Sequence, residues 1–204
     1  MDTKKHIGIP SQVKGACHDT ESQKEFVVPE LAFQKYAELK KRFLNINHWK
    51  DYCGESSTDF KLYNSLGEPV SRNPEIGDFV RINIPGPGDL RTNGFDWVQI
   101  TEITDHHVEQ DEIESMLMLC KPSKIPGNNN ENIAHFYSSE ATSSFRIARG
   151  IDFIRIGIYW RNEVANFSNV GFLGRIRNFI ITLGGFVKVS KIQWKCLAEG
   201  LLDF

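Results

Sequence analysis

The sequence predicts an α+β fold in which an antiparallel, curved sheet packs against amino-terminal and carboxy-terminal helices. Three observations predict it: apolar residues recur at helical spacing over residues 29–44, strand-like alternation dominates residues 79–160, and helical spacing returns from residue 172. Helices followed by antiparallel strands and closing helices are typical of α+β domains, where the apolar face of the sheet is buried on helices.

Residues 1–25 predict a flexible amino-terminal arm, because they contain few large apolar residues and many of Lys, Ser, Gly and Asp. Residues 26–204 then predict a single α+β domain, since one hydrophobic core organises a chain of this length. Pro29 and Glu30 suit the first turn of a helix that ends near Asn45. We expect Asn47 to cap a short second helix that ends at Gly54.

Two strands are expected on either side of a long loop. Phe79–Ile84 alternates apolar and polar residues, as a half-buried strand requires, and Phe95–Ile103 is the return strand. The apolar positions of the return strand change phase after Trp97, which predicts a β-bulge there. Ser115–Cys120 and Ile133–Tyr137 are shorter strand candidates.

Residues 142–160 give the clearest hairpin signal. Two apolar-alternating runs flank a turn that contains glycine, and this turn places Arg149 opposite Asp152. Ile147 then faces Ile154, so both strands turn their apolar residues to the same face of the sheet.

Two helical patterns close the chain. Residues 172–183 have helical spacing, and Gly184-Gly185 ends that helix. Ser190 is the expected cap of a last helix, in which Trp194 lies outside the apolar stripe. The residues that this last helix is expected to bury are Ile192, Cys196, Leu197 and Leu201.

Composition excludes several classes of protein. Apolar residues make up 40% and charged residues 25% of the 204, as in ordinary globular proteins. A net charge of -2 and a pI near 6.3 argue against nucleic acid and acidic membranes as partners. The sequence begins without an apolar secretory signal, contains no run long enough to span a bilayer, and has four widely separated cysteines. We therefore expect a soluble cytoplasmic protein.

The predicted hairpin places Arg146 opposite Arg155, and such a like-charge pair needs an acidic group between its members. One interpretation is an anion-binding site for a carboxylate or phosphate, assisted by Arg161. The other is an internal partner. Residues 102–140 have a net charge of -6 and residues 141–195 one of +7, so the two segments can neutralise each other.

Other ligand-type residues form weaker patterns. The loop with His106, His107, Glu109, Asp111, Glu112 and Glu114 carries metal-ligating side chains, but its spacing matches no metal motif and favours a solvated acidic turn. Cys17 and His18 are adjacent in sequence, which does not make a catalytic pair. Nucleotide-binding and hydrolase motifs are absent, so we expect no catalytic residue, no metal and no cofactor.

The loop between the first two expected strands, residues 85–94, is longer than a hairpin needs. Such loops serve either as lids and binding tips or simply as turns. The candidate residues of this loop are Pro85, Gly86, Pro87, Gly88 and Arg91.

The element order over residues 26–202 is similar to that of the helix-grip folds, which curl a sheet around a long carboxy-terminal helix and often hold an apolar ligand between them. Gly184-Gly185 divides that helix here. We expect a non-catalytic domain that binds a small molecule or a protein. The alternative is an enzyme acting on an anionic small molecule, with Arg146 and Arg155 as the substrate clamp and His135 as the acid or base.

Overall fold

The computed structural model describes residues 6–53, 58–83, 95–105, 108–109, 111–164, 166 and 192–204. These residues form one seven-stranded antiparallel sheet with the strand order β1-β7-β6-β5-β4-β3-β2. The elements are β1 (Ala16–Glu25), α1 (Pro29–Leu44), the 3₁₀ turn η1 (Ile46–His48), α2 (Trp49–Cys53), β2 (Asp59–Tyr63), β3 (Phe79–Asn83), β4 (Asp96–Asp105), β5 (Glu114–Pro122), β6 (Thr142–Arg149), β7 (Phe153–Glu163) and a helical segment at 192–201.

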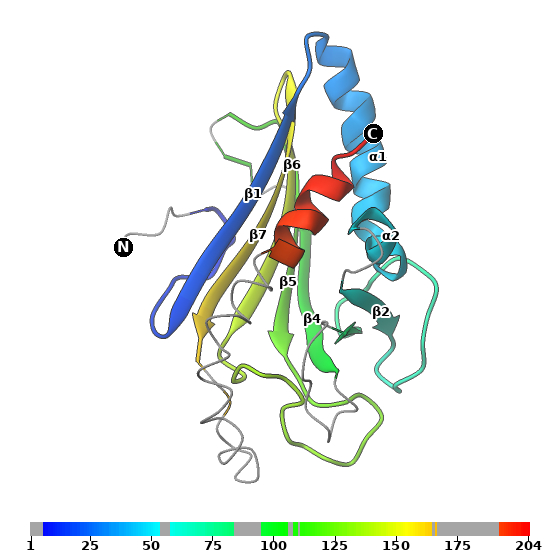
Figure 1. The fold of residues 1–204 in the computed structure, drawn as a ribbon, viewed down its shortest axis with the longest axis vertical. Coiled ribbons are helices and arrows are strands. Elements are labelled where there is room, and N and C mark those ends of the chain that lie inside the picture. Colours follow the sequence, from blue (N-terminus) through cyan, green and yellow to red (C-terminus); the bar gives the residue numbers. More distant parts are fainter. Residues whose placement is uncertain are drawn as a thin grey trace.

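The sheet is curved, and α1, α2 and the helical segment 192–201 lie on the same face of it (Figure 1). We call this the inner face and the opposite side the outer face. The main hydrophobic core lies between the inner face and the helices, where Leu39 and Phe43 of α1 meet Ile147 and Ile156 of the central strands. The predicted α+β class, an antiparallel curved sheet packed against amino-terminal and carboxy-terminal helices, is confirmed. Among the described residues, no helix is long and apolar enough to cross a bilayer.

The first helix agrees with its prediction. Pro29 stands in its first turn, and the helix ends at Leu44 with Lys41 and Arg42 near the negative end of the helix dipole. The side chains that it buries recur at helical spacing and face the sheet. They are Ala32, Tyr36, Leu39 and Phe43.

The expectation of a flexible arm is wrong for residues 16–25. They form β1, which pairs with β7 along almost its whole length. The arm prediction relied on the scarcity of apolar residues, but this edge strand is held by backbone hydrogen bonds and by polar contacts on the outer face. Asp19 binds Arg161, and Glu21 accepts a hydrogen bond of 2.7 Å from the Tyr159 hydroxyl. The remaining division of the chain into arm and domain stays a prediction.

The β6–β7 hairpin forms, but its register is shifted by two residues. Arg149 pairs with Ile154, and Arg146 lies opposite Gly157 rather than Arg155. The reason is visible at Gly150, where an added Cβ would lie 2.1 Å from the Phe153 ring. The absence of a side chain at Gly150 makes room for that ring, and the Gly150 N–H donates to the Phe153 carbonyl at 3.0 Å. The turn therefore runs from Gly150 to Phe153 instead of from Arg149 to Asp152. Because the shift is even, every side chain keeps its predicted face.

Strands β3 and β4 are confirmed, whereas the predicted bulge after Trp97 is misplaced. The register shifts between Ile100 and Glu102 instead. Trp97 packs with Phe79 in a small cluster on the outer face, while the next residue, Val98, enters the main core. This part of the strand is therefore buried on both faces. Apolar residues then follow one another in sequence, and this pattern predicted the bulge.

Two further assignments change around β2. Asp59–Tyr63 is a strand that the sequence did not predict, and Ile133–Tyr137 forms none. Asn47 does not cap a helix by a side-chain bond. Its amide side chain bonds the backbone of Leu62 and Val70 at 2.9 and 2.7 Å, and so ties β2 to the turn before α2. The predicted short helix itself is confirmed as α2, which ends at Cys53.

The last helical segment buries a different stripe from the predicted one. Trp194 is fully buried, and Ile192 is exposed. Trp194 packs on Trp160 of β7 with 5.1 Å between ring centroids. Large aromatic area decides which face turns inward, so the stripe runs through Trp194, Leu197, Ala198 and Leu201. The helix predicted over residues 172–183 and the glycine pair after it lie outside the described residues.

Candidate functional site

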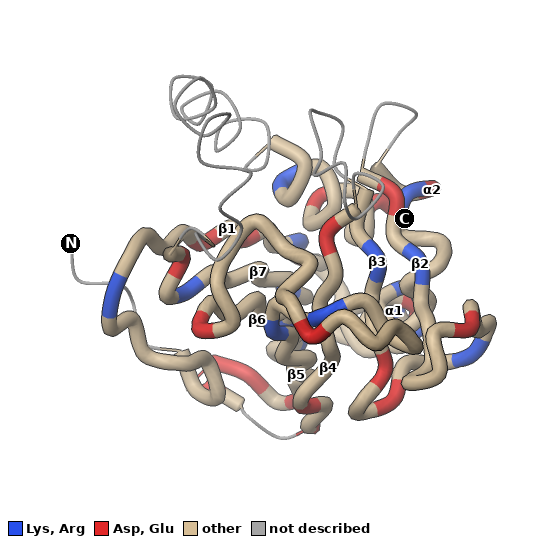
Figure 2. Tube along the Cα trace, turned by 90° about the horizontal axis from the view of Figure 1, so that it is seen from below, with Lys and Arg blue, Asp and Glu red and all other residues tan. Residues whose placement is uncertain are grey.

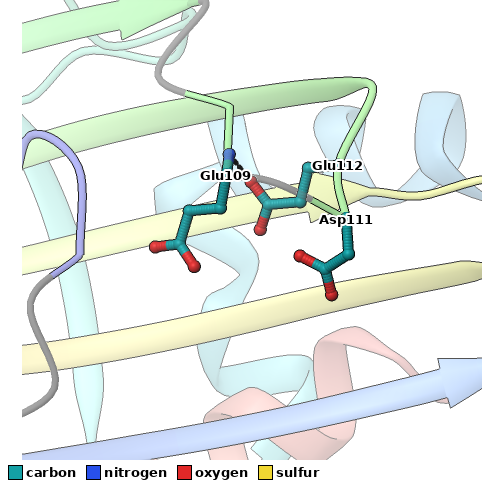
Figure 3. A group of neighbouring side chains, drawn as sticks. All are labelled: Glu109, Asp111 and Glu112. Atoms are coloured by element: carbon teal, nitrogen blue, oxygen red, sulfur yellow. Dashed lines mark hydrogen bonds between the residues drawn. The ribbon is translucent and has the colours of Figure 1, made fainter.

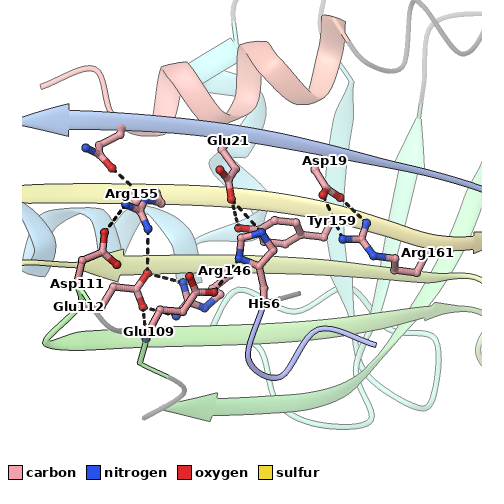
Figure 4. Close-up of polar contacts among 11 residues, drawn as sticks. His6, Asp19, Glu21, Glu109, Asp111, Glu112, Arg146, Arg155, Tyr159 and Arg161 are labelled. Atoms are coloured by element: carbon pink, nitrogen blue, oxygen red, sulfur yellow. Dashed lines mark hydrogen bonds and ion pairs between the residues drawn. The ribbon is translucent and has the colours of Figure 1, made fainter. Parts of the chain in front are cut away.

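Arg146 and Arg155 lie on the outer face and share an acidic partner, as the internal-partner interpretation requires. One guanidinium nitrogen of Arg146 donates to Glu112 Oε1 at 2.7 Å while the other contacts Oε2, and Arg155 reaches the same Oε1 at 3.3 Å. Arg155 also donates to Asp111 at 2.9 Å. Figure 4 shows both guanidinium groups turned toward these carboxylates, with the helices on the far side of the sheet.

Electrostatics reinforce this arrangement. Burial alone would lower the pKa of Arg146, but the hydrogen bond and charge of Glu112 outweigh burial and raise it. The pKa of Arg155 is raised in the same way, with burial opposed by Asp111 and then Glu112. Both arginines are therefore fixed cations with internal anions.

Arg161, the third predicted anion-binding residue, is not part of that group. It is buried and binds the carboxylate of Asp19, with one contact of 3.2 Å and one shorter. Between it and the other arginines lie Tyr159, Glu21 and His6 (Figure 4). The three predicted arginines thus occupy two separate ion-pair groups on one face, each with its own carboxylates.

The acidic loop supplies the carboxylates for the first group. Oxygen atoms of Glu109, Asp111 and Glu112 lie within 4.8 Å of one another, a geometry that a metal ion can use (Figure 3). Asp111 and Glu112 are already bound to arginines, and Glu109 lies 2.7 Å from the His6 ring. These contacts account for the loop without a cation. The two histidines of the predicted cluster, His106 and His107, lie outside the described residues.

The acidic and basic segments do meet, as their opposite charges suggested. Glu112 and Glu114 of the acidic segment pair with Arg146 and Arg149 of the basic one. Figure 2 shows Lys and Arg interspersed with Asp and Glu around the described chain rather than gathered on one side. The long-loop candidates Pro85, Gly86, Pro87, Gly88 and Arg91 lie outside the described residues.

His135 belongs to a different neighbourhood from the arginine clamp. Its Nδ1 accepts a hydrogen bond of 2.9 Å from the Tyr137 backbone, and the acidic groups that act on it are Asp96 and Glu163. Burial, the largest effect, lowers the pKa of His135, while these acids oppose it. The predicted combination of His135 with Arg146 and Arg155 is therefore not assembled in this structure.

A second group of functional side chains lies on the inner face. Cross-strand pairs connect His18 of β1 to Trp160 of β7, Trp160 to Ser143 of β6, and Ser143 to Cys120 of β5. Because paired residues in antiparallel strands point to the same side, these four side chains form one line across the sheet. We call His18, Trp160, Ser143 and Cys120 the inner polar row.

Aromatic rings surround this row. The His18 imidazole stacks on the Trp160 indole at 5.8 Å with 15° between their planes. Trp194 covers Trp160 from the helix side, and Tyr137 approaches it at 6.4 Å. The row thus lies among flat apolar rings, with polar atoms at defined places between them.

A buried carboxylate holds one end of the row. Glu163 Oε2 lies 3.3 Å from His18 Nδ1, and Tyr137 forms a side-chain hydrogen bond with the same carboxylate. Burial, followed by the charge and hydrogen bond of Glu163, raises the pKa of Tyr137, so its phenol stays protonated and donates. With its Nδ1 beside Glu163, the imidazole of His18 leaves Nε2 for another partner.

Four buried polar atoms at this row have no hydrogen-bond partner within the described part of the chain. They are His18 Nε2, Ser143 Oγ, Trp160 Nε1 and Trp194 Nε1, and Glu163 Oε1 at the end of the row is a fifth. Sequence reasoning missed the group because its members come from β1, β6, β7 and the last helix. The only local signal was the pair Cys17-His18, and only His18 belongs to the row, because Cys17 lies where the register between β1 and β7 shifts.

The comparisons with known proteins concern the fold alone. No protein-family model and no curated protein sequence matches the chain. A hypothetical protein from Helicobacter pylori, 10% identical, superposes with a TM-score of 0.50 over 98% of both chains. XoxI from Bacillus cereus is 14% identical with a TM-score of 0.44, covering 93% of this chain and 97% of its own. Norcoclaurine synthase from Thalictrum flavum is 10% identical with a TM-score of 0.35, covering 96% and 99%. The chain shares its overall fold with the Helicobacter protein.

Proposed function

We propose that the chain is a non-catalytic small-ligand-binding domain, and that its ligand lies at the inner polar row. The ligand that suits the row is a flat, partly apolar molecule with at least one hydrogen-bond acceptor. Indole N–H groups can only donate, so Trp160 and Trp194 both require an acceptor. The aromatic walls fit a flat ring system, which stacks on or meets the edges of such rings.

The observation that carries the proposal is the set of unpartnered atoms. A buried polar atom without a partner costs about 1–3 kcal/mol, so five at one place are a large penalty for a folded chain. A ligand that supplies the missing partners removes that penalty when it binds. Its binding free energy then includes hydrogen bonds that these atoms do not form with any described residue.

The outer face also has buried hydroxyls with no partner among the described residues, at Ser115, Thr142 and Ser144. These differ from the inner group because they are hydroxyls alone, whereas the inner group also contains two indole N–H donors and an imidazole nitrogen. Trp97 Nε1 is another unpartnered donor, but its ring packs in the outer cluster with Phe79. Ring N–H donors, an imidazole and aromatic walls come together at the inner polar row.

Two adjacent serines make a matched test. Ser143 and Ser144 are both buried with unpartnered hydroxyls, and they point to opposite faces. The chain purified without added ligand is measured by native mass spectrometry, and the released molecule is identified after denaturation. We expect Ser143→Ala and Trp194→Phe to lower the ligand-bound fraction by about tenfold, the loss of one hydrogen bond. Ser144→Ala should leave it unchanged.

Equal occupancy in the two serine variants would place the ligand elsewhere. If no small molecule accompanies the protein, a fluorescent naphthalene sulfonate probe replaces it, with quenching of Trp160 and Trp194 as the signal. Probe binding that is insensitive to Trp194→Phe and Ser143→Ala would count against the row as a site.

A second candidate, an enzyme acting on a small molecule, is favoured by the contact between His18 and Glu163. A carboxylate that orients an imidazole leaves the other ring nitrogen to accept or give a proton. The native chain and His18→Asn separate the two candidates. An enzyme retains product in the native chain and substrate in the variant, so the co-purified molecules differ in mass. A binding protein yields the same molecule from both.

A further inference from the structure

Apolar side chains gather at the end of the molecule where α1 begins. Val27 is fully exposed, Ile151 is 65% exposed and Phe33 is 59% exposed, although all are large apolar residues. Isolated exposed side chains of this kind need no explanation, but a contiguous group marks an interaction surface. We call the group the apolar tip. It comprises Val27, Val28, Leu31, Phe33, Ile113 and Ile151.

Backbone hydrogen bonds join the three segments that carry these residues. The Phe26 N–H, next to Val27, donates to the carbonyl of Asp152 at 2.7 Å, which joins the β1–α1 turn to the tip of the β6–β7 hairpin. The Ile113 N–H donates to the carbonyl of Arg149 at 2.7 Å, which joins the acidic loop to the same hairpin.

Side chains complete the connection on the helix. The guanidinium of Arg149 lies 5.3 Å from the centre of the Phe33 ring, so Phe33 belongs to the same surface. Leu31 and Phe33 stand on either side of the buried stripe of α1 that contains Ala32. The apolar tip therefore surrounds the start of the helix, and in Figure 1 the β1–α1 turn and the β6–β7 hairpin meet at this end.

The charged groups around the apolar tip that have no ion pair among the described residues are carboxylates. Glu25, Glu30 and Asp152 are exposed beside the apolar residues, and none has an ion pair among the described residues. The nearby bases are already engaged. Arg149 binds Glu114, and Lys35 binds Glu38. The surface thus presents apolar groups interleaved with unneutralised carboxylates.

We infer that the apolar tip docks a protein segment in which apolar residues alternate with Lys or Arg. Such a segment covers the exposed Val27, Phe33 and Ile151 while its cations meet Glu25, Glu30 and Asp152, which gives both affinity and orientation. A second copy of the chain brings the same carboxylates and repels itself. A lipid surface requires the carboxylates to enter the headgroup region, where anionic lipids oppose them. This inference is independent of the ligand proposed for the inner polar row.

The test uses the full chain and two synthetic peptides of about sixteen residues, which differ only in that one carries Lys where the other carries Glu between leucines. Binding is measured by fluorescence anisotropy at low salt. We expect the Lys peptide to bind at least about tenfold more tightly than the Glu peptide, and its affinity to fall as salt is raised.

Variants at exposed positions keep the fold intact. Val27→Asn and Ile151→Asn should each lower the affinity for the Lys peptide about fivefold or more. Ile76→Asn, at an exposed isoleucine in a different loop, is the matched control and should have no effect. The triple change Glu25→Lys, Glu30→Lys and Asp152→Lys should reverse the preference toward the Glu peptide.

Several results would overturn the inference. They are absence of Lys-peptide binding, equal binding of both peptides, or equal loss in the Ile76 control. Co-sedimentation with phosphatidylcholine vesicles that is lost in Val27→Asn would identify a lipid surface instead. A concentration-dependent dimer by light scattering that Ile151→Asn abolishes would identify a second copy.

Discussion

Arg146 and Glu112 form a two-point ion pair on the outer face, in which the side chain of Glu112 has no exposed surface and that of Arg146 is 2% exposed. The pair joins the acidic loop to the centre of the sheet. Arg155 shares the same carboxylate, so one glutamate compensates two cations. Removing one member of such a group leaves buried charge without a partner, which costs far more than the intact pair contributes.

Glu112→Gln should therefore destabilise the protein by about 3–5 kcal/mol, because the buried guanidinium of Arg146 loses its two-point contact with a carboxylate. Urea unfolding followed by circular dichroism measures the loss. Asp111→Asn is the control, since Asp111 is more than half exposed and its pair with Arg155 is worth at most about 1 kcal/mol. A loss below about 1 kcal/mol for Glu112→Gln would mean that the pair is hydrated in solution.

Gly200→Ala should destabilise the chain by about 1–3 kcal/mol even though alanine is the better helix former. An added Cβ would lie 1.8 Å from the backbone oxygen of Tyr52, so the last helix would have to move away from α2. Thermal unfolding shows directly whether Gly200→Ala lowers or raises the stability. Glu199→Ala, an exposed neighbour on the same helix, should change stability by less than about 0.5 kcal/mol. Stabilisation by Gly200→Ala would show that the helix does not pack where the structure has it.

Cys120 should resist alkylation in the folded protein. Complete burial raises the pKa of its thiol to about 12, so little thiolate forms at pH 8. Cys17, Cys53 and Cys196 are only partly buried. With iodoacetamide at pH 8, peptide mapping should show Cys120 modified roughly a hundredfold or more slowly than these three, and at a similar rate once urea unfolds the chain. Comparable rates in the native state would indicate that the inner polar row opens readily.

His135 should make the protein less stable as the medium becomes acidic. Burial holds its pKa below the usual value near 6.5, so the unfolded chain binds a proton more readily than the folded one. Stability from this group is complete above pH 6.5 and is lost as the pH falls from there toward the lowered folded-state pKa.

The comparison is between urea unfolding at pH 7.5 and at pH 5.5. His135→Gln, which retains an acceptor for the Tyr137 N–H, should show a smaller loss than the native chain over this range. An identical pH dependence in both proteins would assign it to other groups.

Local signals in the sequence determined the elements that depend on near neighbours. Pro29 and the spacing of Tyr36, Leu39 and Phe43 predicted α1, and alternation predicted β3, β4 and the hairpin strands. The charge of the segments also predicted that acids would lie between the hairpin arginines. These features follow from periodicities of 3.6 and 2 residues and from like-charge repulsion, which require no knowledge of the fold.

Features that join distant segments were decided by the tertiary structure. β1 has too few apolar residues to be predicted as a strand from its sequence. It forms because β7 offers a free edge and Arg161 binds Asp19. Trp194 points inward because Trp160 lies beneath it, although its own helix suggested another stripe. The inner polar row joins four strands through their pairing, and the apolar tip joins three segments through hydrogen bonds between turns and the contact of Arg149 with Phe33. Sequence spacing specifies which face a residue takes, but cross-strand register specifies its neighbours, and register depends on the packing of the whole sheet.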